Sequence, residues 1–292
     1  MTAVPPNGEL PGGPTVLRML LGSQLRLHRE ASGISTEDAG YEIRASRSKI
    51  SRMENGRVSF KERDVSDLLT LYGVTDDTVR SGLLSMARQA NAQGWWTRFG
   101  DVLPDWFDAY LGLEEGAALI RIYELQFVHG LFQTRDYARA VTGIGRKGVD
   151  EEEIERRVDV RMRRQQLLTR DQPPKIWAVM DEAALRRPVG GRPVMRGQLD
   201  HLLEMAELPH VTLQVVPFNR GSHAAAGGAF TILRFGEPDL PDVVYLEQLT
   251  SALYLEKRED LDYYLEVMDR LCSEASTPAD TLQTLTEIRS TL

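Results

Sequence analysis

Basic side chains and serines gather in one short stretch of the chain, ASRSKISRMENG at residues 45–56. Between Arg44 and Arg63 the sequence holds seven basic residues against two acidic ones. Guanidinium and ammonium groups bind phosphate, arginine also pairs with guanine edges, and serine is a less specific donor and acceptor. The chemistry on offer is recognition of a nucleic acid. A basic helix with a solvated face is the plainer alternative.

The net charge of −8 argues against such a partner until its distribution is considered. Residues 1–82 carry 11 basic and 11 acidic groups, which leaves 24 basic and 32 acidic groups for the rest of the chain. The acidity therefore lies in the C-terminal part, and the basic patch can still attract phosphate locally. The one cysteine, Cys272, excludes an internal disulfide and fits a cytoplasmic protein. No apolar run is long enough for a membrane span.

Helical spacing and capping residues predict the elements that position the basic patch. Five short helices are expected within residues 16–92, preceded by a disordered tail over 1–15. Ser35 is expected to cap the second helix and Ser46 the third, which runs to about Glu54. Gly56 supplies a permissive backbone in the loop that follows. We predict a compact all-helical domain.

The second and third of these helices have the spacing of a helix-turn-helix. Ile50 and Met53 would pack inward on the small Ala39 and Gly40. The side chains expected to face the DNA groove are Arg47, Ser48, Ser51 and Arg52. The side chains placed to hold phosphates are Thr36, Lys49, Asn55, Arg57 and Lys61. The agreement of caps, spacing, apolar pair and loop favours DNA binding over a merely solvated helix.

This segment, GSQLRLHREASGISTEDAGYEIRASRSKISRMENGR, resembles the Xre-type helix-turn-helix of phage repressors and many bacterial regulators. The resemblance implies base-reading positions at Arg47, Ser48 and Arg52. It implies phosphate-holding positions at Thr36, Ser46, Lys49 and Asn55. Two departures stand out: Arg44 occupies a position where the family often has glycine, and Ala39 one where it often has leucine. The turn between the helices is therefore expected to differ in detail.

The rest of the chain is predicted to fold as a mixed α+β domain over residues 111–292, with a small sheet of about four strands. The strand candidates are KIWAVMD, HVTLQVVPF, AFTILRF and DVVYLEQL, and residues 120–127 are strand-like or mixed. Residues 151–164 are predicted to form a long helix whose five acids and five arginines compensate one another on a solvated face. A Trp-rich junction at residues 93–110 is interpreted as a plug between domains, with a ligand lid or a protein interface as the alternative.

The C-terminal part also carries a resemblance, through HGLFQTRDYARAV, RRQQLL, IWAVMDEAALRRPVGG and VVYLEQLTSALYLE. Together with the Trp-rich junction, these motifs are similar to the large C-terminal domain of actinobacterial Xre-type regulators. That family is described as antitoxin-like and is commonly encoded beside a small partner protein. The resemblance implies a domain that binds a partner protein or a small effector.

The sequence as a whole predicts a transcriptional regulator, a homodimer that binds double-stranded DNA at a palindromic operator and dimerises through its C-terminal domain. The alternative is an antitoxin-type protein that neutralises a small neighbouring protein and autoregulates its operon. No enzyme is predicted, because the five histidines show no metal-binding spacing and no nucleophile motif is present, and no cofactor is expected. The segment NRGSHAAAGGAF is interpreted as a flexible hairpin connection. In a sharper interpretation it is a flap over an effector pocket, with Arg220 and His223 as polar contacts.

Overall fold

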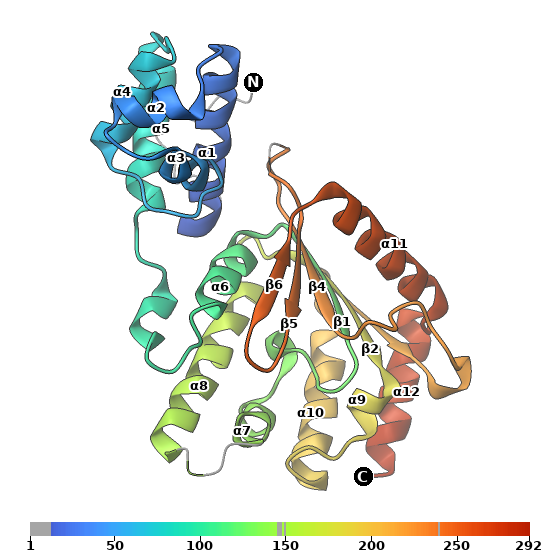
Figure 1. The fold of residues 1–292 in the computed structure, drawn as a ribbon. Coiled ribbons are helices and arrows are strands. Elements are labelled where there is room, and N and C mark those ends of the chain that lie inside the picture. The colour runs from blue at the N-terminus through green and yellow to red at the C-terminus, as the bar shows by residue number, and fades with distance from the viewer. Residues whose placement is uncertain (1–12, 145–147, 149, 239) are drawn as a thin grey trace. The chain divides into compact units, whose positions relative to one another are not determined.

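The computed structural model of the chain describes residues 13–144, 148, 150–238 and 240–292, and within them the chain forms two compact units (Figure 1). The N-terminal unit contains the chain up to Thr97 with Leu111–Gly116 and Glu237–Leu240. The C-terminal unit contains Arg98–Tyr110, Ala117–Gly236 and Pro241–Leu292. Most of the predicted tail over residues 1–15 lies outside the described residues. Residues 14 and 15 belong to the first helix.

Five helices build the N-terminal unit, in line with the sequence prediction. Polar side chains fix where three of them begin: Ser35 accepts from Asp38 N, Ser46 from Lys49 N, and Asp76 from Thr78 N and Val79 N. Each of these bonds satisfies a backbone donor that a helix leaves free in its first turn. The helices are α1 (Pro14–Ala31), α2 (Thr36–Glu42), α3 (Arg47–Glu54), α4 (Glu62–Leu71) and α5 (Asp77–Ala90).

One apolar core holds these helices together. Leu21 and Leu25 of α1, Ile50 and Met53 of α3 and Leu83 of α5 are buried in it. α1 and α3 pack closely at Gly22, where an added Cβ would lie 2.4 Å from the carbonyl oxygen of Met53. The absence of a side chain at residue 22 is therefore what allows α1 to lie against the end of α3.

A six-stranded mixed sheet in the order β3-β2-β1-β4-β5-β6 is the centre of the C-terminal unit. β1 pairs in parallel with β2, and β2 with β3, whereas the pairs β1–β4, β4–β5 and β5–β6 are antiparallel. The strands are β1 (Leu119–Glu124), β2 (Lys175–Asp181), β3 (Val211–Val216), β4 (Phe230–Arg234), β5 (Val243–Glu247) and β6 (Ala252–Leu255).

The mixed α+β class is confirmed, but the expected number of about four strands is wrong. β1 was ambiguous because its alternating apolar residues continue past Glu124 into a segment without strand geometry. β6 escaped prediction because it is four residues long and pairs with β5 alone. A short edge strand carries too few residues for its alternation to be recognised.

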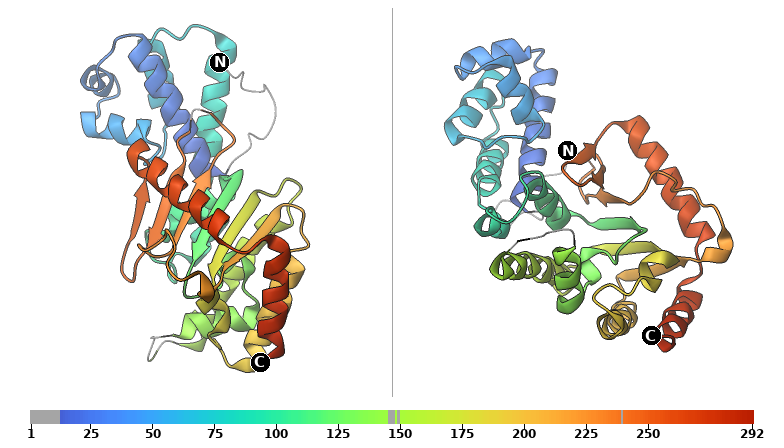
Figure 2. Two further views of the ribbon diagram at one scale, coloured as in Figure 1. Left: turned by 90° about the vertical axis from the view of Figure 1, so that its right-hand side faces the viewer. Right: turned by 60° about the horizontal axis from the view of Figure 1, so that its bottom comes forward.

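Helices lie on both faces of the sheet (Figure 2). On one face α11 packs Met268 and Leu271 into a cluster with Val244 and Ile232 of the sheet. The helices outside the N-terminal five are α6 (Phe107–Gly116), α7 (Arg135–Gly143), α8 (Glu151–Arg164), α9 (Glu182–Arg186), α10 (Arg192–Met205), α11 (Arg258–Glu274) and α12 (Pro278–Ser290). Within the described residues, none is long and apolar enough to cross a membrane.

Four short 3₁₀ helices connect these elements. They are η1 (Trp95–Phe99), η2 (Gly130–Phe132), η3 (Gln165–Leu168) and η4 (Phe218–Arg220). η2 is the next element after β1, and the residues that flank it, His129 and Gln133, are both buried in the C-terminal unit. The helix η3 continues α8 without a break.

Candidate functional site

Helices α2 and α3 form a helix-turn-helix whose turn brings the backbones of Gly40 and Ala45 into contact. The amide of Ala45 donates to the carbonyl of Gly40 over 2.8 Å, and a Cβ at residue 40 would lie 2.7 Å from the carbonyl oxygen of Ala45. Arg44 lies between them with φ of 53°, in the left-handed region that glycine adopts most easily. Arg44, one of the two departures from the pattern that the segment resembles, therefore occupies the one described non-glycine position with a positive φ.

The two sides of α3 differ as the sequence predicts. Ile50 and Met53 are buried in the core of the unit beside Ala39. The opposite side presents exposed Arg47, Ser48, Ser51 and Arg52. Residues four positions apart lie on the same side of a helix, so the pairs Arg47–Ser51 and Ser48–Arg52 form two neighbouring rows of one polar surface, which we call the α3 outer face.

The other residues predicted to contact DNA differ in how exposed they are and in whether they already have a partner within the unit. Ser46 is exposed, and its hydroxyl is the cap of α3. Asn55 donates to the carbonyl of Ser51 over 2.8 Å and so closes the last turn of α3. Lys49 is half-buried, and its ammonium lies 2.9 Å from the carboxylate of the buried Asp64. Arg57 and Lys61 are exposed, and Thr36 is half-buried at the start of α2.

An ion pair that the sequence analysis missed holds the end of α3. Arg29 of α1 donates to Glu54 twice, Nε to Oε1 over 2.5 Å and Nη2 to Oε2 over 3.1 Å. Arg29 also donates through Nη1 to the carbonyl of Ile34 over 3.0 Å. The bonds to Glu54 raise the pKa of Arg29, despite the opposing effect of burial. The sequence feature that could have indicated this ion pair is Glu54 itself, an acidic residue inside a basic stretch.

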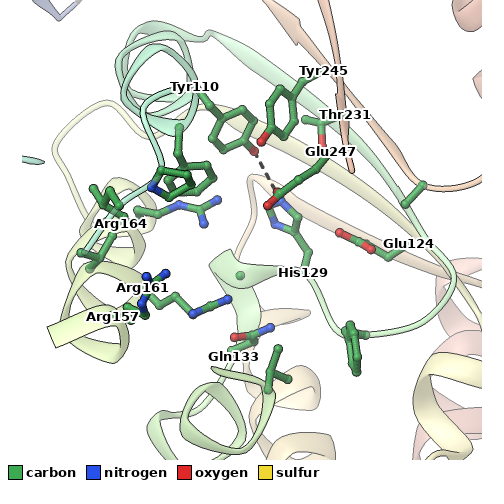
Figure 3. A pocket seen from close by; sticks show the side chains of 18 of the residues that line it. Tyr110, Glu124, His129, Gln133, Arg157, Arg161, Arg164, Thr231, Tyr245 and Glu247 are labelled. Atoms are coloured by element: carbon green, nitrogen blue, oxygen red, sulfur yellow. Dashed lines mark hydrogen bonds between the residues drawn. The ribbon is translucent and has the colours of Figure 1, made fainter. Parts of the chain in front are cut away.

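A cavity of about 710 Å³ lies within the C-terminal unit, between the sheet and α8 (Figure 3). Its volume falls in the range of small-molecule sites, roughly 300–1,000 Å³. Aromatic rings and polar groups both contribute to its wall. The labelled lining residues are Tyr110, Glu124, His129, Gln133, Arg157, Arg161, Arg164, Thr231, Tyr245 and Glu247.

The sheet supplies the acidic side of this cavity. Thr231 of β4 lies opposite Ile122 of β1 and opposite Tyr245 of β5. Directly opposed residues share a face, and so do residues two apart along a strand. Glu124 and Glu247 therefore project from that same face, each at the last position of its strand.

Helix α8 supplies the basic side, and here the expectation of a solvated charged face is wrong for Arg164, which is buried. Arg157, Arg161 and Arg164 recur at helical spacing and line the cavity. Arg164 is buried, with its guanidinium 5.3 Å from the ring centres of both Phe107 and Tyr110. The charge pattern alone predicted a solvated face. The spacing of charges along a helix does not show whether an arginine is exposed to water or stacked on aromatic rings.

His129 lies between the two sides and is neutral at pH 7. Burial, with Arg164 and Arg161 as further causes, holds its pKa well below the usual value. The amide of Leu131 donates to its Nδ1, so the remaining ring proton belongs on Nε2, which faces the hydroxyl of Tyr110 at 3.5 Å. The hydroxyl proton of Tyr110 is then directed away from the histidine.

Burial also governs the acidic side. It raises the pKa of Glu124 to about 8, with the nearby Glu247 as a second cause and Arg164 opposing. At pH 7 the two carboxyl groups therefore carry fewer than two negative charges. A cation placed between the two carboxyl groups would offset the negative charge of Glu247, and with it one cause of the raised pKa of Glu124.

Arg220 and His223 do not line this cavity. His223 packs on the other face of the sheet, where its Nε2 lies 3.1 Å from the hydroxyl of Tyr123 and 3.6 Å from a carboxylate oxygen of Asp181. Arg220 is exposed at the end of η4. A role for these two residues with an effector stays a prediction that the cavity does not support. Trp106, from the Trp-rich junction, does line the cavity.

Among the described residues, no three His, Cys, Asp or Glu side chains lie together in a way that could hold a metal ion. The candidate chemistry of the chain is therefore of two kinds: a polar helix face in the N-terminal unit, and a cavity with opposed charges in the C-terminal unit.

The helix-turn-helix of the N-terminal unit is typical of DNA-binding regulators. Residues 20–81 match a family described as a helix-turn-helix domain, which overlaps the five helices. Residues 107–287 match a family described as a domain of unknown function (DUF5753). Because this match covers more than half of the chain, the protein belongs to the DUF5753 family. No curated protein and no solved structure is similar enough to the chain to count as a match.

Proposed function

We propose that the protein is an Xre-type transcriptional regulator that reads a specific DNA sequence through the α3 outer face. One observation carries this proposal: α3 buries Ile50 and Met53 while it exposes Arg47 and Arg52 on the opposite side. A helix with that division can enter the major groove and present its arginines to base edges. The Arg29–Glu54 pair supports it by holding α3 in a fixed position.

The regulator acts as a homodimer on a palindromic operator. A single α3 covers only one half-site, and helix-turn-helix dimers bind two half-sites about 34 Å apart. Dimerisation through the C-terminal unit, in the cytoplasm, is part of this proposal. Light scattering of the purified full chain tests it, because a monomer at the concentrations that bind DNA would contradict the dimer.

Selection from a random duplex library with the purified full chain tests DNA binding. The expected result is an enriched motif with two-fold symmetry. Fluorescence anisotropy then measures the affinity for that motif and for a scrambled duplex over a salt series. Equal affinity for the two duplexes would contradict sequence-specific recognition, and a symmetric motif with a strong preference would support it.

We propose further that the C-terminal unit senses a small molecule in the cavity of Figure 3 and couples its binding to DNA affinity. The supporting observation is a cavity of ligand size in which polar groups converge from the sheet, η2 and α8. The proposed role is regulatory, not enzymatic. In anisotropy measurements, a cavity ligand is expected to change the affinity for the selected operator.

A second candidate function is that of an antitoxin-type protein, the kind of regulator known from actinobacteria. The observation on its side is the apolar β5–β6 hairpin, where Leu249 at the tip and Leu253 of β6 are exposed. Co-expression with the product of the adjacent gene separates the two functions. A stoichiometric complex, together with relief of that product's toxicity, would favour the antitoxin, whereas an operator response to small molecules alone would favour sensing.

A further inference from the structure

The two carboxylates of the cavity stand on either side of one strand. β1 and β5 both pair antiparallel with β4, so they run in the same direction and end at the same edge of the sheet. Neighbouring strands lie about 4.8 Å apart, which places Glu124 and Glu247 about 10 Å apart across β4 at the backbone. Both side chains point into the cavity in Figure 3.

A positively charged group is the best occupant of the space between these two carboxylates. Two carboxylates across a partly buried cavity repel unless one is protonated or a cation lies between them. Burial is the largest cause of the raised pKa of Glu124, and the negative charge of the nearby Glu247 is the second. A primary ammonium offers three donors, enough to contact both carboxylates at once.

The α8 side of the cavity is suited to the opposite charge. Arg161 is half-buried and donates to the hydroxyl of Thr142 over 2.7 Å, which fixes its direction. Arg164 is held by the rings of Phe107 and Tyr110. A planar guanidinium that is already oriented loses little freedom when it binds a carboxylate through two hydrogen bonds.

The lining of the cavity also includes a polar acceptor and aromatic surface. Oε1 of Gln133 is buried and has no hydrogen-bond partner among the described residues. An amide oxygen left in that state calls for an N–H donor, because buried polar groups are normally paired. The rings of Tyr110 and Tyr245, with centroids 4.2 Å apart, supply aromatic surface elsewhere in the lining. A ligand with an amide N–H and an apolar side chain would satisfy both.

We propose that the cavity binds a short peptide-like zwitterion, with its ammonium between Glu124 and Glu247 and its carboxylate at Arg161 and Arg164. Its amide N–H donates to Gln133, and its side chains pack on the tyrosine rings. This inference deepens the proposed sensing function and names the class of ligand. A dipeptide carries both charges and an amide N–H for this cavity of about 710 Å³, whereas a free amino acid lacks the amide N–H that Gln133 would bind.

Calorimetry with the full-length protein and three matched probes tests the charge requirement without any substitution. The probes are the dipeptide Leu-Phe, its N-acetyl derivative and its C-terminal amide. Each derivative removes one charge and keeps the rest of the molecule. The free dipeptide is expected to bind at least about tenfold more tightly than either derivative, since each loses one charged contact. Equal binding of the N-acetyl derivative would overturn the cation site, and equal binding of the amide would overturn the anion site.

Variants assign each end of the ligand to its side of the cavity. Glu247→Gln is expected to weaken the dipeptide and the amide about tenfold and to leave the N-acetyl derivative unchanged. Arg161→Gln is expected to weaken the dipeptide and the N-acetyl derivative and to leave the amide unchanged. The matched controls are Glu204→Gln on α10 and Arg258→Gln on α11, both exposed and outside the cavity. Equal effects of a control and its cavity counterpart would contradict the assignment.

Calorimetry without DNA keeps this inference separate from the sensing function. If the dipeptide binds with the expected pattern but leaves operator affinity unchanged, the ligand class stands and the coupling fails. If no probe binds at millimolar concentration, the peptide-like zwitterion is overturned, whatever the protein does on DNA.

Discussion

Arg29 donates two hydrogen bonds to the carboxylate of Glu54, and this pair joins α1 to the last turn of α3. Both side chains are largely buried, with 11% and 7% of their surfaces exposed. Removal of one member of a buried pair leaves the other as an unpaired buried charge, which costs more than the pair itself contributes.

The Arg29→Ala variant is therefore expected to destabilise the N-terminal unit by about 3 kcal/mol. Hydrogen exchange of the full chain measures this locally, as a loss of protection in α1 and α3. Arg26→Ala is the matched control, because Arg26 makes an exposed pair with Glu30 one helical turn away in the same helix. Such a pair contributes at most about 1 kcal/mol. Equal loss of protection in the two variants would show that the Glu54 contact does not hold α3.

A substitution in the turn of the helix-turn-helix is expected to raise stability instead of lowering it. Arg44 has a φ of 53°, a conformation in which a Cβ costs about 1 kcal/mol. Arg44→Gly removes that strain and is expected to raise the stability of the N-terminal unit by up to about 1 kcal/mol, which thermal unfolding measures as a higher Tm. Arg44→Ala keeps the Cβ and is expected to bring no gain. A gain of the same size with alanine would trace the effect to the lost charge instead.

Two substitutions separate base recognition from phosphate contact on DNA. Arg47 is exposed on the α3 outer face, and Arg47→Ala is expected to cost about 1–3 kcal/mol of binding and to relax the preference at one base pair. Lys61 precedes α4 and is exposed outside that face. Lys61→Ala is expected to weaken all sequences alike and to reduce the slope of affinity against salt. Anisotropy on the selected operator and its single-base variants measures both, and unchanged binding in both variants would contradict the proposed groove contacts.

Local signals in the sequence were enough for the N-terminal unit. Ser35 and Ser46 cap their helices as expected, and Ile50 and Met53 are buried as the helical spacing indicated. These features depend on residues within one or two turns of each other. Sequence separation explains what was missed, because Arg29 reaches Glu54 across 25 positions and Lys49 reaches Asp64 across 15.

In the C-terminal unit, too, local signals are visible in the sequence and contacts between distant residues are not. Helix α12 was missed although Thr277, Pro278 and Asp280 form a recognisable start signal, with Thr277 accepting from Asp280 N. The cavity had no local signal at all. Glu124 and Glu247 become neighbours only through the pairing of β1 and β5 with β4, which no spacing along the chain reveals.

The carboxyl group of Glu124 predicts how stability depends on pH. Its pKa is about 8 in the folded protein, against about 4.3 for an unfolded glutamate. Between these values the folded state holds a proton that the unfolded chain does not hold, so the free energy of unfolding falls as pH rises. His129 acts in the opposite direction, because its lowered pKa makes the unfolded chain take up a proton below about pH 6.5.

The effect of Glu124 is therefore seen most clearly between about pH 6.5 and 8, where His129 is neutral in the folded protein and at most half protonated in the unfolded chain. The free energy of unfolding of the C-terminal unit is expected to fall by about 1–2 kcal/mol across this interval. Urea unfolding followed by circular dichroism measures it. Glu124→Gln should remove the fall, and Glu247→Gln should reduce it, since Glu247 is one cause of the raised pKa. The exposed Glu204→Gln should retain it in full, and a fall that persists in Glu124→Gln would place the proton elsewhere.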